Sequence, residues 1–454
     1  MTVLIIVAKV CLIFTIVVLT LYGLRHYLLA FCRLSIRRPK DMMELSGYVL
    51  PHVSIMVPMH NEERVAADVL EALVEVDYNW ERLEIIAIDD RSTDRTAEIV
   101  DEFASRYPII KPLHIQEGAG GKAPALKLAT QHAKGEIILL FDADYFPGRS
   151  MIKQLVAPFC DAEVGAVMGR VVPHNQGATL LASLLGLERA AGYQIGQQAR
   201  HNLGLTPQFG GTVGGVRVSA LRSVGGWNTE SLTEDTDLTF RLISEGWKVA
   251  YVNRAECYEE VPENWEVRKK QIARWAIGHT DCLHRLGPSV ARSKVLSFGE
   301  KVDALFVLGC YLTAPVLVLG WIASLVLFFS PQMAVVPPLL VALAFAGYQI
   351  FGNQATFVEL GTAALLDGNA RSVLLIPVNL FNFFASTAAI CGALGHYYSG
   401  RLFGSRGPRW HKTERFRENG GNGTTFRNGN GNGNALFSRA PNGLYVYNYE
   451  HRVR

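Results

Sequence analysis

Two aspartates separated by a single residue, Asp142 and Asp144, follow directly after the apolar run 137–141. A carboxylate beside a buried apolar strand is costly unless a cation or hydrogen-bond donors compensate its charge. Paired carboxylates provide the oxygen ligands that Mg²⁺ and Mn²⁺ prefer, and diphosphate oxygens can complete the coordination. We therefore expect Asp142 and Asp144 to hold Mg²⁺ or Mn²⁺ together with a diphosphate.

Polar and acidic residues also follow two earlier apolar runs. Asp89 and Asp90 come after the second run, and His60 and Glu62 come just after the first. Ligands of an open α/β sheet bind beyond the carboxyl ends of its strands, so these residues are expected on one edge. Short acids also form turns and cap helices, and a purely structural role for Asp89 and Asp90 stays open.

A lysine and a second acidic pair stand where helical patterns begin. Lys122 follows the glycine-rich segment 118–121, where backbone N–H groups and a cation together attract phosphate. An ordinary solvated lysine fits the same spacing. Glu234 and Asp235 open a second pattern, where acids suit the helix dipole without any catalytic role. The functional alternative makes Asp235 the general base for an attacking sugar hydroxyl, a step that needs an ionised carboxylate.

Gln271, Arg274 and Trp275 are spaced i, i+3 and i+4, so on a helix they share one face. The arginine can neutralise a departing diphosphate, and the indole can stack on a sugar ring. The alternative is a helix at the membrane surface, in which the arginine extends to water and the tryptophan lies at headgroup depth. Residues 263–286 fit such an amphipathic helix.

The elements that must position these residues alternate between short apolar runs and longer helical patterns. This alternation predicts βαβ units and a mainly parallel sheet. The expected strands are 53–57, 83–88, 109–115 and 137–141, and the expected helices are 62–74, 94–107 and 122–133. No glycine-rich dinucleotide or Walker motif follows these strands, so a metal-assisted diphosphate site replaces the usual phosphate loop in this interpretation.

Apolar residues make up 49% of the 454-residue chain and are concentrated in four runs. Each has roughly the 20 residues that a helix needs to cross a bilayer. The runs are 3–24, 302–329, 333–351 and 373–394. The first is too long for a signal peptide and is followed by basic residues, which puts the middle of the chain in the cytosol. We expect a multi-pass protein of the plasma or bacterial inner membrane.

Other features exclude classes of function or leave the topology open. A net charge of +3 with interleaved acids argues against nucleic-acid binding, and seven cysteines without C-x-x-C spacing indicate neither a zinc site nor a disulfide framework. The Gly/Asn-rich segment 419–434 predicts a flexible linker. Polar residues around 353–367 could run along the interface instead of crossing it, so the number of passes stays open.

In chain order, the motifs Asp89-Asp90, Asp142-Ala143-Asp144, Thr233-Glu234-Asp235 and 271–275 resemble the D, DxD, TED and QxxRW series of membrane-bound family 2 glycosyltransferases. That family includes cellulose, hyaluronan, chitin and mannan synthases. The resemblance implies a GT-A catalytic domain in which Asp90 contacts the nucleotide base and Asp235 is the base. It further resembles plant-type mannan and glucan synthases between residues 209 and 275.

The resemblance also implies roles for the remaining residues. The segment 209–212 is similar to an acceptor-side loop, and 410–413 is similar to a tail motif that closes over bound donor. The implied donor-binding residues are His60, Glu62, Asp90, Lys122, Asp142, Asp144 and Arg274. The implied acceptor-binding residues are Gly211, Thr212, Glu234, Gln271 and Trp275.

Together these features predict an α/β GT-A domain, Rossmann-like and nucleotide-sugar-binding, joined to a multi-pass α-helical transmembrane region. The expected division is a transmembrane helix at 1–30, the cytosolic catalytic domain at 50–260, interfacial helices at 261–300, transmembrane segments at 301–400 and a cytosolic tail at 401–454.

The expected activity is inverting and processive transfer of hexose from UDP-glucose, UDP-N-acetylglucosamine or GDP-mannose to a β-linked polysaccharide that is exported through the bilayer. The expected partners are therefore the nucleotide-sugar donor, a glycan or glycolipid acceptor and the lipid bilayer. A non-processive glycolipid transferase similar to ceramide glucosyltransferases is the nearest alternative. A nucleotide-sensing channel or transporter is the alternative from another class.

Overall fold

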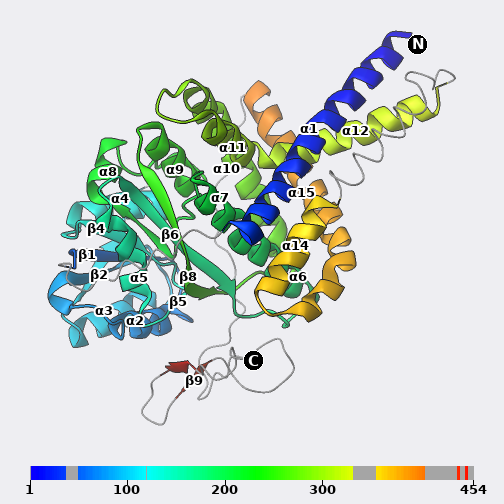
Figure 1. The fold of residues 1–454 in the computed structure, drawn as a ribbon. Coiled ribbons are helices and arrows are strands. Elements are labelled where there is room, and N and C mark those ends of the chain that lie inside the picture. Colours follow the sequence, from blue (N-terminus) through cyan, green and yellow to red (C-terminus); the bar gives the residue numbers. More distant parts are fainter. Residues whose placement is uncertain are drawn as a thin grey trace. The chain divides into compact units, whose positions relative to one another are not determined.

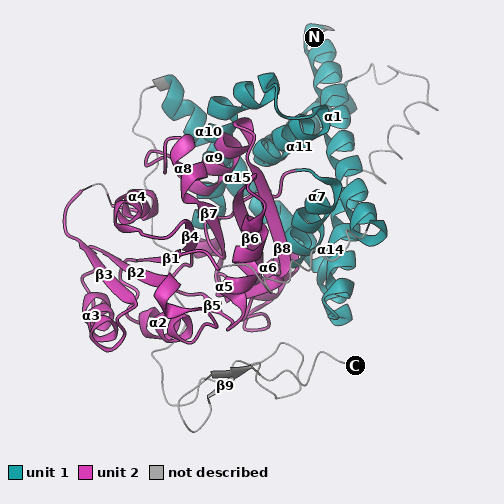
Figure 2. Cartoon of the chain, turned by 60° about the vertical axis from the view of Figure 1, so that its left-hand side comes forward, with its two compact units in different colours: residues 1–40, 190–205, 269–409 teal, residues 41–189, 206–268, 410–454 magenta. Residues whose placement is uncertain are grey.

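A computed structural model describes residues 2–36, 50–118, 120–330, 354–403, 437–439 and 445–447. The chain divides into two compact units, which Figure 2 colours separately. Unit 1 comprises residues 1–40, 190–205 and 269–409, and unit 2 comprises residues 41–189, 206–268 and 410–454. The expected span 333–351, the linker 419–434 and the tail motif 410–413 lie outside the described residues. The predicted five-part division stays a prediction.

Unit 2 is built on an eight-stranded sheet with the order β3-β2-β1-β4-β7-β6-β8-β5. Its first half is parallel and confirms the four predicted strands, with small shifts at their ends. These strands are β1 (Val53–Met59), β2 (Leu83–Asp90), β3 (Ile110–Ile115) and β4 (Ile137–Leu140). The residues of β1, β2 and β4 are mostly apolar and buried, as expected where helices cover both faces of a parallel sheet, whereas most of β3 at the sheet edge is exposed or half-buried.

The second half of the sheet corrects the expectation of a mainly parallel arrangement. It contains β5 (Phe146–Pro147), β6 (Val164–Pro173), β7 (Gly214–Arg217) and β8 (Lys248–Glu259). Strand β7 runs antiparallel to both β4 and β6, and β5 runs antiparallel to β8, whereas β6 and β8 are parallel. Antiparallel β7 therefore joins the two halves of the sheet.

Two glycines in β7 allow this junction to close. A Cβ atom on Gly214 would lie 2.4 Å from the Val167 carbonyl oxygen, and one on Gly215 would lie 2.3 Å from the Leu139 side chain. Side chains therefore do not fit at either position, because the neighbouring strands approach too closely.

Helices cover both faces of the sheet (Figure 1). Helices α2 (Ala66–Val74) and α3 (Thr96–Arg106) lie on one face of the first strands, and α4 (Lys122–His132) lies on the other. These are the three predicted helices, although α2 begins four residues later than expected because residues 60–65 form a turn. Helix α2 buries Val69, Leu70 and Leu73, a spacing typical of an amphipathic helix.

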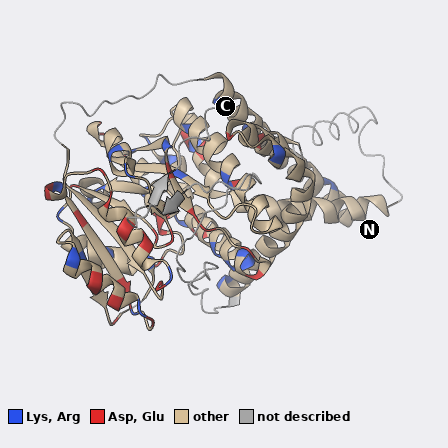
Figure 3. Ribbon diagram, turned by 90° about the horizontal axis from the view of Figure 1, so that it is seen from below, with Lys and Arg blue, Asp and Glu red and all other residues tan. Residues whose placement is uncertain are grey.

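The remaining helices of unit 2 accompany the second half of the sheet. They are η1 (Trp80–Arg82), α5 (Met151–Val156), η2 (Ala157–Cys160), α6 (Leu180–Ala190), α8 (Val218–Ser223) and α9 (Glu234–Ser244). Lysine, arginine and acidic residues are interspersed over the sheet-bearing unit, as Figure 3 shows. The described part of the tail adds a small antiparallel pair, β9 (Phe437–Arg439) and β10 (Tyr445–Tyr447).

Unit 1 is helical. Its elements are α1 (Thr2–Ser35), the π-helix η3 (Ala191–Gln197), α7 (Gln198–Leu203), α11 (Phe298–Leu308), η4 (Cys310–Leu312), α12 (Thr313–Phe328), α14 (Ala355–Leu366), η6 (Ala370–Leu375) and α15 (Ile376–Phe403). Helix α1 packs against α7, α12 and α14. Helix α10 (Trp265–Arg292) contains the boundary between the two units, which falls after Arg268.

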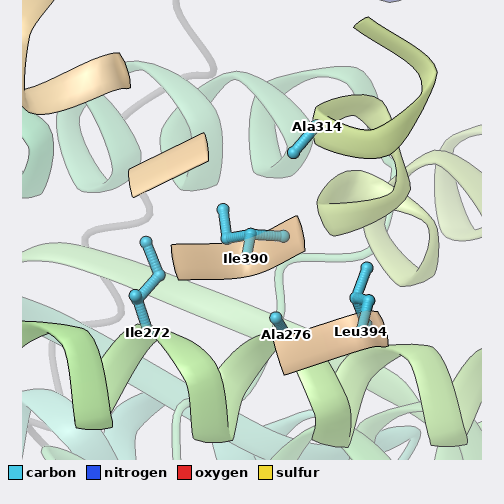
Figure 4. Close-up of a cluster of buried hydrophobic side chains, with 5 residues drawn as sticks. All are labelled: Ile272, Ala276, Ala314, Ile390 and Leu394. Atoms are coloured by element: carbon cyan, nitrogen blue, oxygen red, sulfur yellow. The ribbon is translucent and has the colours of Figure 1, made fainter. Parts of the chain in front are cut away.

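A small apolar core joins three helices of unit 1 (Figure 4). Ile272 and Ala276 of α10 pack with Ala314 of α12 and with Ile390 and Leu394 of α15. The predicted helix at 263–286 is thus confirmed as a helix, and one of its faces is occupied by neighbouring apolar helices.

Three helices among the described residues are long and apolar enough to cross a membrane: Val3–Ser35, Cys310–Phe328 and Ala370–Leu402. The expected single span 302–329 is therefore wrong in its extent. Helix α11 ends at Leu308 and a 3₁₀ turn precedes α12, with the Thr313 hydroxyl donating to the Cys310 carbonyl at 2.6 Å. Helix α14 has 12 residues, too few to cross the roughly 30 Å hydrocarbon core.

Candidate active site

The two aspartates at the carboxyl end of β2 make different contacts. Asp89 accepts the Ser92 backbone N–H at 3.2 Å and faces the His114 ring at 3.2 Å, so it forms a turn as the structural alternative expects. Asp90 instead contacts a distant segment, because one of its oxygens accepts the Gly121 backbone N–H at 2.8 Å. Asp90 thereby joins the end of β2 to the start of α4.

The segment after β1 lies against this same end of β2. His60 donates from Nδ1 to the Asp90 carbonyl oxygen at 2.6 Å, and the Glu62 backbone N–H donates to the Thr96 hydroxyl at 2.8 Å. Asn61 has a left-handed backbone with φ of 54°, and its side-chain oxygen accepts the Thr93 N–H at 2.7 Å. His60 and Asp90 are therefore neighbours, as predicted from the strand ends.

Lys122 is not an ordinary solvated lysine. Its Nζ atom lies 2.5 Å from Asp142 Oδ1, across 20 residues of sequence. Burial alone would lower the pKa of this ammonium, but the attraction of Asp142, Glu234 and Asp235 outweighs it and raises the pKa. The lysine at the start of α4 therefore stays charged and lies near both later acidic motifs.

The loop before β7 contacts two of these motifs. The Asp142 backbone N–H donates to the Thr212 hydroxyl at 3.1 Å. Gly211 has φ of 70°, and a Cβ atom there would lie 3.0 Å from the Asp235 Cβ and 3.3 Å from Asp235 Oδ2. Glycine is favoured at position 211 because the left-handed backbone and the close approach of Asp235 both disfavour a side chain.

Glu234 and Asp235 open α9, as the pattern predicts. Thr233 is the N-cap residue but makes no side-chain capping bond, whereas Asp235 Oδ1 accepts the Thr236 N–H at 2.7 Å. Glu234 is buried and Asp235 is half-buried. The Asp237 side chain has a structural role, because it is fully buried and pairs with Arg241 at 2.6 Å. Asp235 therefore assists the helix start while remaining partly accessible.

Asp144 differs from Asp142 in its surroundings. Its side chain is buried with 4% of its surface exposed, whereas Asp142 is half-buried beside Lys122. Asp144 lies near Cys257 of β8, where burial and the aspartate charge raise the thiol pKa. Among the residues that the structure describes, no three His, Cys, Asp or Glu side chains are grouped to hold a metal ion. The expected metal-binding role of Asp142 and Asp144 stays a prediction.

Gln271, Arg274 and Trp275 lie on α10 in unit 1, whereas the other motifs belong to unit 2. Their spacing does place them on one helix, and all three are half-buried. The Trp275 carbonyl lies 3.1 Å from His279 Nδ1 one turn later. Their predicted roles toward donor and acceptor remain predictions.

Two side chains beside the site have contacts that the sequence interpretation missed. Arg91 pairs with Asp90 at 2.9 Å, and the His114 ring bridges Asp89 and Asp101. The sequence offered a signal for the Arg91–Asp90 ion pair, because Arg91 directly follows the aspartate pair. The contact of His114 with Asp89 depends on strand register, because these two residues are partners in the β2–β3 pairing.

These contacts bring the motifs from the end of β1 to the start of α9 together in unit 2. The model of Glycosyltransferase like family 2 matches residues 51–278, half of the chain. The chain belongs to this family. The match includes each motif from the end of β1 to Trp275, so the GT-A-like fold with its mixed sheet is that of a family 2 glycosyltransferase.

Curated relatives of this family 2 chain include both lipid and polysaccharide enzymes. It is 35% identical over 260 residues to the Probable glycosyltransferase YdaM of Bacillus subtilis (strain 168), covering 57% of the chain and 60% of that relative. It is 34% identical over 229 residues to a Beta-monoglucosyldiacylglycerol synthase of Synechocystis sp., covering 50% and 48%. It is 27% identical over 271 residues to Glucomannan 4-beta-mannosyltransferase 7 of Arabidopsis thaliana, covering 58% and 49%.

The chain thus spans about half to three fifths of the length of these curated relatives. Among solved structures, it is similar to the mannosyltransferase PcManGT from Pyrobaculum calidifontis in complex with GDP-Man and Mn²⁺. The TM-score is 0.54 and the identity 23%, with 80% of this chain and 98% of that chain covered. This similarity supports the fold of the family 2 chain.

Proposed function

We propose that this protein is an inverting hexosyltransferase that transfers sugar from a nucleotide-diphosphate donor to an acceptor held at a membrane. The observation that carries the proposal is the charge cluster in which Lys122 pairs with Asp142 and is attracted by Asp235. The Lys122 ammonium and the Asp142–Asp144 pair suit a bound diphosphate. The Asp235 carboxylate suits an attacking hydroxyl group.

The donor end of the site comprises Asp90 for the base and Asp142, Asp144 and Lys122 for the diphosphate. Carboxylate oxygens suit Mg²⁺ or Mn²⁺, and the diphosphate oxygens supply further ligands in this proposal. When bound, the metal stabilises the negative charge on the departing diphosphate. The Lys122 ammonium exchanges its contact with Asp142 for a phosphate oxygen, which keeps its charge compensated.

Asp235 acts as the general base. Its carboxylate takes the proton from the acceptor hydroxyl as that oxygen bonds to the anomeric carbon from the face opposite the diphosphate. The bond from the anomeric carbon to the diphosphate oxygen breaks, and its electron pair leaves with the nucleoside diphosphate. The configuration is therefore inverted. Gly211, Thr212 and Glu234 line the acceptor side in this arrangement, because Gly211 and Glu234 adjoin Asp235 and Thr212 follows Gly211 in the same loop.

From the resemblance of residues 271–275 to the QxxRW motif, Gln271 and Trp275 are assigned to the acceptor and Arg274 to the diphosphate. The three helices suitable for crossing a membrane support attachment to the bilayer, with the catalytic part in the cytosol and the chain passing the membrane several times.

Two classes of product fit this site. Relatives named as glycolipid synthases share 34–35% identity with the chain, which favours addition of one hexose to a membrane lipid. The glucomannan mannosyltransferase relative and the sequence Gln271–Trp275 before the membrane helices favour processive synthesis of an exported β-linked polysaccharide. The lipid product is our first candidate because the identity is higher.

Product analysis distinguishes these classes. Membranes containing the full chain are incubated with labelled UDP-glucose, UDP-N-acetylglucosamine or GDP-mannose, each alone with Mn²⁺. A labelled lipid carrying one sugar supports the glycolipid enzyme, whereas label in a long glycan that an endoglycanase degrades supports the processive enzyme. No transfer from any donor, in membranes that also contain lipid extract as acceptor, contradicts both.

Asp235→Asn tests the catalytic step itself. We expect turnover to fall by about 10²- to 10⁴-fold, the usual contribution of a general base, with donor binding retained. Glu245→Gln, at the exposed far end of α9, is the matched control and should retain activity. Full function in Asp235→Asn would instead favour the nucleotide-sensing channel or transporter.

A further inference from the structure

We propose that Arg91 selects the nucleobase. Its guanidinium and the Asp90 carboxylate form an adjacent donor and acceptor, which together recognise a ring N–H beside a carbonyl oxygen. Uracil and guanine present that edge, whereas adenine and cytosine do not. This inference rests on the proposed function, because it requires Asp90 to lie in the donor site.

The backbone at Arg91 is held in an uncommon conformation. Its φ of 56° is left-handed, a region that residues other than glycine rarely adopt. The Arg91 N–H donates to the Ile115 carbonyl of β3 at 3.1 Å, and the following residue, Ser92, donates to Asp89 at 3.2 Å. Such backbone outliers cluster at ligand sites, where surrounding contacts maintain them.

The Arg91 side chain contacts the carboxylate of the preceding residue, Asp90. Its Nε atom lies 2.9 Å from Asp90 Oδ1 and its Nη2 atom lies 3.4 Å from Asp90 Oδ2. Its Nη1 atom donates to the Gly118 carbonyl oxygen at 2.9 Å. A planar guanidinium thus has fixed positions relative to both carboxylate oxygens, which is the geometry that specific recognition needs.

Gly120 lies beside this guanidinium. A Cβ atom on Gly120 would lie 1.1 Å from Arg91 Nη2, so a side chain there would displace the guanidinium from its present position. The next residue, Gly121, donates its N–H to Asp90 Oδ2 at 2.8 Å and immediately precedes Lys122. The pair therefore contacts the start of α4, which carries Lys122 of the proposed diphosphate site.

The exposure of the two side chains suits a ligand. The Asp90 side chain is 8% exposed, whereas that of Arg91 is 34% exposed and therefore partly accessible to solvent. An incoming base can give its ring N–H to Asp90 and accept from Arg91 at its carbonyl. A base with an unprotonated ring nitrogen at that edge would face the carboxylate without a hydrogen and be rejected.

Nucleotide binding to the full-length protein in detergent tests this assignment. Isothermal titration calorimetry with Mn²⁺ measures the affinity for UDP, GDP, CDP and ADP separately. We expect the wild type to bind UDP or GDP about 10- to 100-fold more tightly than CDP and ADP, since one charged hydrogen-bonding group is left unmatched in the rejected bases. In Arg91→Ala this preference should fall by about tenfold, and Arg91→Lys should be intermediate because it keeps the charge but not the planar fork.

Two controls separate base selection from other roles. Arg95→Ala removes an arginine whose side chain is 73% exposed and pairs with Glu98, so all four affinities should be unchanged. Binding of Mn²⁺-pyrophosphate should also be unchanged in Arg91→Ala and Arg91→Lys. A loss of pyrophosphate binding would assign Arg91 to the diphosphate and overturn base selection.

The binding data distinguish a failure of base selection by Arg91 from a failure of the proposed function. If both Arg91 variants keep the wild-type ratio of UDP or GDP to CDP and ADP, base selection by Arg91 is wrong and the proposed transferase stands. If the wild type binds none of the four nucleotides, the proposed function is wrong, and the role of Arg91 is excluded with it.

Discussion

Individual carboxylates of this site differ in what surrounds them, although the sequence presents them as similar motifs. Asp89 and Asp237 are satisfied by turn and ion-pair contacts within their own surroundings. Asp90 and Asp142 instead contact residues of the α4 start, Gly121 and Lys122. Asp142 is therefore paired with a cation and Asp90 accepts a backbone N–H, so both contact a distant segment and not only their own turn.

At the scale of single residues, the charge of His114 predicts how stability depends on pH. Burial alone would lower its pKa, but hydrogen bonds to Asp101 and Asp89 outweigh that and raise the pKa in the folded protein. A raised folded pKa means that the stabilisation is complete below about pH 6.5, the unfolded value, and is lost as pH rises through the folded value. The difference in thermal stability between wild type and His114→Gln should therefore be larger at pH 6 than at pH 9.

The same measurement on His132→Gln provides the control. His132 ends α4 on the exposed surface, and its substitution should produce no comparable change in the pH dependence of unfolding. Equal losses for His114→Gln at both pH values would contradict the ionic bridge between Asp89 and Asp101.

At the scale of elements, the position of β7 decides how the site is assembled. This short strand separates the parallel half of the sheet from β6 and β8, and the loop before it carries Gly211 and Thr212. Periodicity predicts β1 to β4 well because their apolar runs are bounded by turns. It does not predict β7, because a glycine pair in a four-residue strand has no alternation and its pairing partners are distant in sequence.

Gly215→Val tests the close packing of β7. The new Cβ atom would approach the Leu139 side chain to 2.3 Å and the Ile138 carbonyl oxygen to 2.7 Å, so the strand must shift. We expect a loss of about 1–3 kcal/mol or more in unfolding free energy, as for other overpacked cores. Denaturant unfolding of the solubilised protein measures it. Gly148→Ala, where no atom lies within 4 Å of the added carbon, should change stability little.

At the scale of the whole molecule, the two units differ in where their apolar side chains lie. Unit 2 buries its apolar residues between helices and sheet, whereas α1 of unit 1 exposes large apolar side chains along its length, such as Val10, Phe14 and Leu21. Exposure of this kind suits a lipid environment. Unit 1 nevertheless contains buried charges, because Asp303 of α11 pairs with Arg25 of α1 at 2.7 Å and with Arg200 of α7 at 3.2 Å.

Asp303→Asn tests whether these charges hold unit 1 together. Removing one acid leaves two buried arginines without their shared partner, and we expect a loss of about 3–5 kcal/mol in stability. Thermal unfolding in detergent measures this. Glu98→Gln, in an exposed ion pair with Arg95, is the control and should cost less than about 1 kcal/mol. A similarly small effect of Asp303→Asn would show that apolar packing alone orders these helices.

The sequence by itself determined the family motifs, the first four strands, their helices and the existence of long apolar helices. Each of these follows from local periodicity or from residue types within a few positions. The tertiary structure decided which acids meet a cation, because Lys122 and Asp142 are 20 residues apart and Asp142 and Thr212 are 70 apart. It also decided the break before α12 and the contact of Arg91 with the Gly118 carbonyl oxygen, because such contacts depend on how segments distant in the sequence pack, which no local pattern records.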